Sequence, residues 1–252
     1  MPRYRLTVEY HGGAFNGWQR QEEGRPSVQA ALEEAATALN GGVMPVIHGA
    51  GRTDAGVHAS GQVAHLDLDR VIEGGNLRDA MNFRLHHVPV VVLEAAPVRD
   101  TFHARFSAKA RHYCYRILNR RGPAALDLGR VWHISRPLDV EAMQRGADVL
   151  CGHHDFTSFR ATECQSRSPE KTLERLEVRR QGEDVLVYAS ARSFLHNQVR
   201  IMVGTLRQVG DGRWTPDDVA RALAARRRAA AGPTAPPDGL VLTGVDYDDW
   251  GD

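Results

Sequence analysis

The sequence of 252 residues contains only three cysteines and two lysines, Lys109 and Lys171, and no apolar run of membrane-spanning length. Cys114, Cys151 and Cys164 show no paired spacing, which argues against a disulfide scaffold and favours reduced thiols. The first ten residues, MPRYRLTVEY, lack the apolar core of a signal peptide. We therefore expect a cytoplasmic globular protein with no membrane segment.

A metal site is also poorly supported by the sequence. Cys151 is followed by His153 and His154, which are residue types that bind zinc. No second ligand pair at zinc spacing completes the set, so we predict a helix end followed by a polar loop and no metal site.

The charges that are present are unevenly distributed. The net charge is only +1, which excludes a uniformly basic surface. Residues 99–121, however, contain a single acid, Asp100, and seven basic residues: Arg99, Arg105, Lys109, Arg111, Arg116, Arg120 and Arg121. Phe102, Phe106, Tyr113 and Tyr115 are interleaved with them. This pattern suits phosphate contact with base stacking, and it equally suits a solvated strand whose aromatic face lies in the core.

The first half of the chain predicts the order β-α-β-β-α-β. The alternation in YRLTVEY indicates a strand, and Ser27 is a helix cap before apolar positions on one face. Further strands are expected at 43–48, 62–68 and 88–98, and Asn76 is expected to cap the second helix.

The second half repeats this order without repeating the sequence. We expect strands at 112–118, 173–179, 185–191 and 240–247. Helices are expected after Asp139, over 195–209, and from Thr215, where a cap, a proline and two acids follow one another. The sequence therefore predicts an α+β fold of two tandem ferredoxin-like halves, 1–107 and 108–252, with joined, mainly antiparallel sheets and a catalytic cleft between them.

The segment HGAGRTDAGVHAS at 48–60 is the strongest candidate for chemistry. Asp54 is its only acid, Arg52 can supply a countercharge, and the glycines leave room for a bulky substrate. An ionised, accessible carboxylate acts as a nucleophile or as a weak general base. The local pattern alone favours another interpretation, a structural turn with a salt-bridged aspartate.

Several motifs resemble one family. AGRTDAGVHA is similar to the signature of the TruA family of tRNA pseudouridine synthases. Further segments that resemble the family, in the same order along the chain, are GWQRQ, FHARFSAKARHYCY, DFTSFRA, VRIMVGTL and GLVLTGVDY. The resemblance spans nearly the whole chain.

This resemblance implies a function and a set of site residues. The family converts uridine to pseudouridine at positions 38, 39 and 40 of the tRNA anticodon stem-loop, as a homodimer and without a cofactor or an essential metal. By resemblance, Asp54 is the catalytic residue and Tyr113 stacks on the base. Arg200 pairs with the aspartate, Arg52 accompanies the flipped nucleotide, and Leu240 lines the pocket.

Other roles are expected from residue type. Trp18 is either a staple for its loop or a contact to RNA, and Arg20, Arg105 and Lys109 are expected phosphate ligands. His58, four residues after Asp54, is expected to hydrogen-bond to backbone and to take no part in catalysis.

Two other function classes make different demands on the sequence or the product. An RNA-binding module with two RRM-like halves would need surface aromatics in the RNP pattern, which the strands lack. A carboxylate-dependent hydrolase would release free uracil, so product analysis separates it from an isomerase. Neither class explains the distributed family resemblance.

Overall fold

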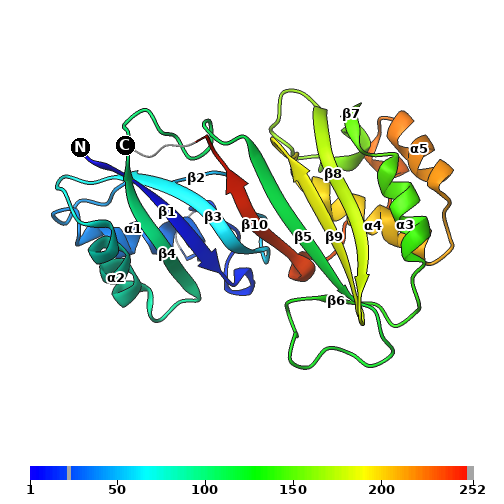
Figure 1. Cartoon of the computed structure of the whole chain (residues 1–252), viewed down its shortest axis with the longest axis horizontal. Coiled ribbons are helices and arrows are strands. Elements are labelled where there is room, and N and C mark those ends of the chain that lie inside the picture. The colour runs from blue at the N-terminus through cyan, green and yellow to red at the C-terminus, as the bar shows by residue number, and fades with distance from the viewer. Residues whose placement is uncertain (22–23, 249–252) are drawn as a thin grey trace. The chain divides into compact units, whose positions relative to one another are not determined.

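The computed structural model describes residues 1–21 and 24–248 and forms two compact units (Figure 1). The first unit holds Met1–Arg111 together with the segment that begins at Leu242, and the second holds His112–Val241. The units differ from the sequence-based halves 1–107 and 108–252 in one main respect: the C-terminal segment lies with the first unit.

The first unit has the predicted β-α-β-β-α-β order. Its elements are β1 (Arg3–Tyr10), α1 (Val28–Thr37), β2 (His48–Gly49), β3 (His58–Asp67), α2 (Gly74–Leu85) and β4 (Val90–Val98), and β10 (Leu240–Asp246) enters the unit at Leu242. The strand order is β4-β1-β3-β10, with β2 also pairing with β3. The pairs of β1 with β3 and with β4 are antiparallel.

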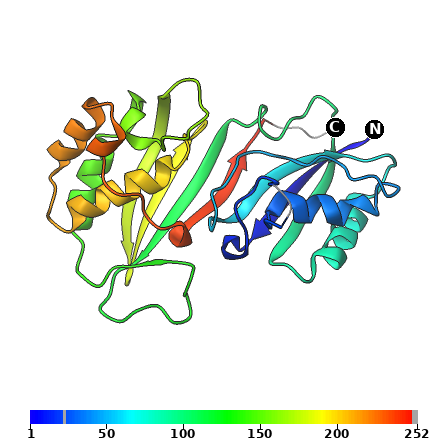
Figure 2. The same cartoon turned by 180° about the vertical axis from the view of Figure 1, so that it is seen from behind.

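One face of this sheet carries the helices (Figure 2). In β1 the side chains of Tyr4, Leu6 and Val8 are fully buried and alternate with half-buried polar residues. Ser27 caps α1, as predicted, by accepting the N–H of Ala30 at 3.3 Å. Apolar side chains on one face of β1 therefore anchor the unit.

Two sequence-based expectations for the first unit were wrong. The helix cap is Glu73 and not Asn76, because the Glu73 carboxylate accepts two backbone N–H groups at 2.9 Å, from Gly75 and Asn76. Residues 43–47 form no strand. The backbone of Ile47 bonds instead to α1 side chains, with its N–H to Glu33 at 3.1 Å and its carbonyl to Gln29 at 3.1 Å.

The second unit adds two short strands to the predicted elements. It contains β5 (Ala110–Leu118, from His112), β6 (Trp132–His133), α3 (Val140–Asp148), β7 (Gly152–Asp155), β8 (Glu170–Gln181), β9 (Asp184–Ala191), α4 (Gln198–Gly210) and α5 (Pro216–Ala224). The strand order is β5-β9-β8-β7, antiparallel between β7, β8 and β9, and β6 pairs with β5 in parallel. The short strand β7 replaces the polar loop expected after Cys151.

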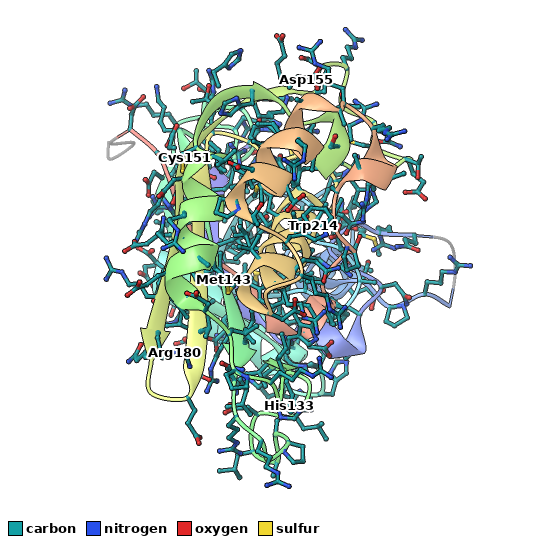
Figure 3. All side chains as sticks on the ribbon, turned by 90° about the vertical axis from the view of Figure 1, so that its right-hand side faces the viewer. His133, Met143, Cys151, Asp155, Arg180 and Trp214 are labelled. Carbon is teal, nitrogen blue, oxygen red and sulfur yellow. The ribbon has the colours of Figure 1, made fainter. Side chains whose placement is uncertain are left out.

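Two helices of this unit, α3 and α5, begin where the sequence predicts, whereas α4 begins at Gln198 and not at residue 195. Asp139 caps α3 by accepting the N–H of Ala142 at 2.9 Å, and Thr215 forms a capping box with Asp218 at the start of α5. Figure 3 shows α3, which carries the buried Met143, along β8. The α+β class with two ferredoxin-like halves is thus confirmed.

Candidate active site

Asp54 lies half-buried on a tight turn between β2 and β3. Its backbone carbonyl accepts the N–H of Val57 at 3.1 Å, which closes the turn. Gly56, inside the turn, has a φ of 80°, in the left-handed region that glycine adopts without a Cβ clash. The glycine that the sequence places two residues after Asp54 is therefore required by the turn.

The residue before Asp54 is held through both its backbone and its side chain. The carbonyl of Thr53 accepts the N–H of Trp18 at 3.1 Å, and its hydroxyl shares a buried hydrogen bond of 2.8 Å with the phenol of Tyr10. Burial raises the pKa of Tyr10, so this phenol stays neutral. Gly17 permits the close approach, since a Cβ there would lie 2.6 Å from the Thr53 carbonyl oxygen.

The segment that leads into the turn is fixed in the same way. The N–H of Ala50 donates to the Val63 carbonyl at 2.7 Å, and the Gln62 side-chain amide donates to the Gly51 carbonyl at 2.9 Å. The buried Arg111 donates to the Ala50 carbonyl at 2.6 Å. Asp54 thus sits on a backbone that three different elements hold.

His58 makes the hydrogen bond to backbone that the sequence predicts. It is buried at the start of β3, and its Nδ1 accepts the N–H of Gly12 at 2.9 Å. Its ring also lies 4.5 Å from that of His11, centroid to centroid.

The burial of Trp18 bears on its two expected roles, a staple for its loop or a contact to RNA. Its ring is only 3% exposed and packs near Gly49, where a Cβ would lie 2.5 Å from the indole. This burial supports the staple, and the RNA contact expected at Trp18 stays a prediction. Arg20 is exposed and pairs through Nε with the buried Glu33 at 2.6 Å.

The other basic residues expected to contact tRNA lie at the surface of the first unit. Arg52 and Arg105 are exposed. Lys109 is exposed and pairs with Asp248 at 2.8 Å. Exposed basic side chains are accessible to phosphates, and the tRNA contacts expected at Arg52, Arg105 and Lys109 stay predictions.

Two tyrosines of β5 belong to the second unit. Tyr115 is fully buried, and its hydroxyl donates to the Pro236 carbonyl at 2.8 Å. Tyr113, on the same face by strand alternation, is half-buried and meets the Phe194 ring edge-on at 5.2 Å. One tyrosine therefore supports the structure, and the other keeps part of its ring accessible.

Arg200 is held on α4 within the same unit. Its Nε donates to the Ala235 carbonyl at 2.8 Å, and its Nη1 donates to the Asn197 side-chain oxygen at 2.7 Å. Asn197, which precedes α4, has a left-handed φ of 61°. Leu240, at the start of β10, is 4% exposed. The guanidinium is thus oriented by its own helix and by the segment that leads to Leu240.

Sequence reasoning missed several residues near the loop. Arg111 follows the same strand alternation as Tyr113 and Tyr115, so it occupies the apolar face of β5. An arginine at such a position signals a buried partner, and this signal was available in the sequence. The rings of His48, His65 and His103 lie together, with centroids 4.6–5.5 Å apart, and no local motif predicts that grouping.

Comparison with known proteins identifies the family. The sequence profile described as tRNA pseudouridine synthase matches residues 147–248. Proteins named tRNA pseudouridine synthase A are 60% identical in Nitrobacter winogradskyi and 61% identical in Rhodopseudomonas palustris. Each match covers 98% of this chain, with 96% and 99% of the respective relative. This chain belongs to the tRNA pseudouridine synthase A family.

The relatives extend the family assignment to the first unit. The profile match lies between α3 and the end of the described chain and does not include Asp54. A third relative, from Paramagnetospirillum magneticum, is 59% identical over 98% of the chain. A solved structure titled "Crystal Structure of a Cbf5-Nop10-Gar1 Complex" is a distant match, at a TM-score of 0.39 and 11% identity over 95% of the chain. None of the helices in residues 1–21 and 24–248 is long and apolar enough to cross a membrane.

Proposed function

We propose that this enzyme converts uridine to pseudouridine at positions 38, 39 and 40 of the tRNA anticodon stem-loop, with Asp54 as the catalytic residue. Membership of the tRNA pseudouridine synthase A family makes the chain an isomerase that acts on uridine in tRNA. The family resemblance supports the three positions in the anticodon stem-loop.

The observation that carries the role of Asp54 is the rigid presentation of a half-buried carboxylate. Hydrogen bonds from other segments of the unit to Ala50, Gly51 and Thr53 hold the loop just before Asp54. A structural salt-bridged aspartate does not need this support, whereas a reacting group must stay within a fraction of an ångström of its target.

The isomerisation defines what the carboxylate must do. The N1–C1′ glycosidic bond breaks, the uracil turns, and a C5–C1′ bond forms; C5 loses its proton and N1 ends with one, so no atom enters or leaves. Asp54 has two routes to assist: covalent attack on the sugar or the base, or removal of a ribose proton. Both require the uridine to leave the helical stack, at a cost of a few kcal/mol.

The family resemblance assigns the remaining roles. Tyr113 stacks on the flipped base, which is worth about 1–3 kcal/mol and offsets the cost of unstacking. Arg200 pairs with the Asp54 carboxylate, Arg52 contacts the flipped nucleotide, and Leu240 lines the pocket. The half-buried ring of Tyr113 and the low exposure of Leu240 are compatible with these roles. Arg20, Arg105 and Lys109 are proposed as phosphate ligands.

Mapping of the product on tRNA tests the proposed function. Unmodified transcripts that carry a single uridine at position 38, 39 or 40 are incubated with the enzyme, and pseudouridine is located by carbodiimide adducts and primer extension. We expect modification at each position and no free uracil. Pseudouridine only elsewhere in the tRNA would overturn the proposed positions, and release of uracil would indicate a hydrolase.

The proposal also includes the assembly and location of the enzyme. By family resemblance it acts as a homodimer in the cytoplasm, with tRNA bound by both subunits. Sedimentation at micromolar concentration tests the assembly, and a monomer that retains full activity would contradict it.

A further inference from the structure

Phe106 is an exposed aromatic side chain in a basic segment of the first unit. It is 72% exposed, whereas Phe102, four residues earlier, is fully buried with Ala50, Val63 and Ala104. Phe102 therefore anchors the segment, and Phe106 contributes little to the core.

The turn that carries Phe106 is rigid. The N–H of His103 donates to the Ser107 hydroxyl at 3.0 Å, and the N–H of Ser107 returns to the His103 carbonyl at 2.9 Å. The N–H groups of Arg105 and Phe106 both point to Nδ1 of His103, at 3.2 and 3.4 Å. An exposed ring on such a turn has lost most of its backbone freedom before any ligand binds.

The Phe106 ring packs against the His103 ring, which in turn packs against His65. The buried His65 lies 4.6 Å from His103, and His103 lies 4.4 Å from Phe106, between ring centroids. The Nδ1 of His65 accepts the N–H of Ala104 at 3.2 Å, which attaches the turn to β3. The Arg105 guanidinium lies 5.7 Å from the Phe106 ring centroid and places a positive charge next to it.

The turn is also tied to the loop of Asp54. The buried Arg111 donates to the Ala50 carbonyl at 2.6 Å and to the Arg105 carbonyl at 2.7 Å. Ala50 is four residues before Asp54, so one guanidinium bridges the two segments. The position of Phe106 relative to the catalytic loop is thus fixed within this unit.

We propose that Phe106 is a stacking platform for a nucleobase of the tRNA substrate, next to the nucleotide that reacts. The inference rests on the proposed function. The ligand that fits is a flat ring with a nearby phosphate: the exposed ring of Phe106 takes the base, and Arg105 takes the negative charge. Phe106 is a positioning residue and does not touch the reacting atoms.

Two phenylalanines of the first unit form a matched pair for the test. Phe83 on α2 is 77% exposed and lies outside the basic segment. Binding of an unmodified tRNA transcript is measured for Phe106→Ala, Phe106→Trp and Phe83→Ala at several salt concentrations. We expect Phe106→Ala to weaken binding about 5- to 100-fold, Phe106→Trp to bind like wild type, and Phe83→Ala to change binding less than about twofold.

Two further readouts separate stacking from charge and from folding. Stacking releases no counterions, so Phe106→Ala leaves the slope of binding against salt unchanged, whereas Arg105→Ala lowers that slope by about one. Tryptophan fluorescence is expected to be quenched by tRNA more strongly in Phe106→Trp than in Phe83→Trp.

The outcomes distinguish this inference from the proposed function. Wild type that modifies tRNA while Phe106→Ala binds it equally well would overturn the platform alone. A changed oligomeric state of Phe106→Ala with unchanged tRNA binding would indicate a contact between copies and would also overturn it. Wild type that neither binds nor modifies tRNA would overturn both.

Discussion

The phenol of Tyr10 and the hydroxyl of Thr53, the residue before Asp54, share a buried hydrogen bond of 2.8 Å. This bond joins β1 directly to the residue before Asp54, the proposed catalytic residue. If Asp54 is the catalytic residue, the bond gives β1 a role in positioning its carboxylate.

Removal of this bond is expected to lower activity more than stability. Tyr10→Phe leaves the Thr53 hydroxyl with one partner fewer, which costs about 1 kcal/mol of unfolding free energy. Because Asp54 follows Thr53, we expect kcat to fall about 3- to 10-fold with little change in KM. Urea unfolding and single-turnover kinetics check both effects.

Tyr4 provides the matched control for this substitution. It is also buried on β1, and its hydroxyl bonds to the backbone of Ile72 at 2.7 and 2.8 Å, away from the loop. Tyr4→Phe should cost a similar unfolding free energy and leave kcat unchanged. Equal losses of kcat in the two variants would contradict a positioning role for Tyr10.

The unfolding free energy is expected to decrease as the pH is lowered, because of His65. Burial, together with the charges of His103, Arg3 and His48, lowers the pKa of His65 to about 4, and the opposing effect of Asp67 is the smallest of these. Between pH 6.5 and 4 the unfolded chain therefore binds a proton at this site that the folded chain does not. Its contribution to the unfolding free energy is complete above pH 6.5 and is lost as the pH falls toward 4.

Urea unfolding at pH 7.5, 6 and 5 tests this pH dependence. His65→Asn retains an acceptor oxygen for the Ala104 N–H but does not titrate, so its stability should fall less steeply over this range. The same pH slope in wild type and His65→Asn would contradict the assignment.

The segment that holds Arg200 explains a requirement for glycine on α4. A Cβ at Gly204 would lie 1.8 Å from the Pro233 carbonyl oxygen. Two residues further on, the Ala235 carbonyl accepts the Nε–H of Arg200. Gly204→Ala must displace this backbone, so we expect a loss of about 3 kcal/mol or more in unfolding free energy and reduced activity.

Gly146→Ala on α3 is the control, because its nearest contact is the flexible Leu206 side chain at 3.1 Å. The helix preference of alanine offsets that crowding, so a change within about 1 kcal/mol is expected. Thermal and urea unfolding measure both variants. A Gly204→Ala protein as stable as Gly146→Ala would contradict the close approach.

The proposed pairing of Arg200 with Asp54 predicts a shift in pH dependence. Loss of a nearby positive charge makes a carboxylate harder to ionise. In Arg200→Ala the acidic limb of the pH–rate profile is expected to move to higher pH, and in Arg200→Lys it should move less. An unchanged limb in Arg200→Ala would contradict the pairing.

Local chemistry made much of the fold predictable. Ser27, Asp139 and Thr215 are caps whose side chains reach only their own helix, so the sequence contains all that is needed. The segment 43–47 reads as a strand because its residues are apolar, but Glu33 on α1 takes the Ile47 N–H. A partner distant in sequence decided that case, and local patterns do not contain it.

The candidate site was also predictable only where local sequence decides it. Asp54 stands out as a lone acid among glycines, and the family signature marks it. The sequence shows Phe106 only as one of several aromatics in a basic segment. The structure distinguishes it, because Phe102 is buried in the core and Phe106 is exposed. The contacts of Arg111 with Ala50 and Arg105 join segments 61 residues and 6 residues away, which no spacing rule predicts.

The most direct test compares Asp54→Asn with Asp69→Asn on one tRNA transcript. Asp69 is an exposed aspartate of the same unit, outside the loop. With tRNA bound to each protein, single-turnover formation of pseudouridine is followed. We predict that Asp54→Asn binds tRNA but forms no pseudouridine, while Asp69→Asn matches wild type. Pseudouridine formation by Asp54→Asn at the wild-type rate would contradict the catalytic role of Asp54.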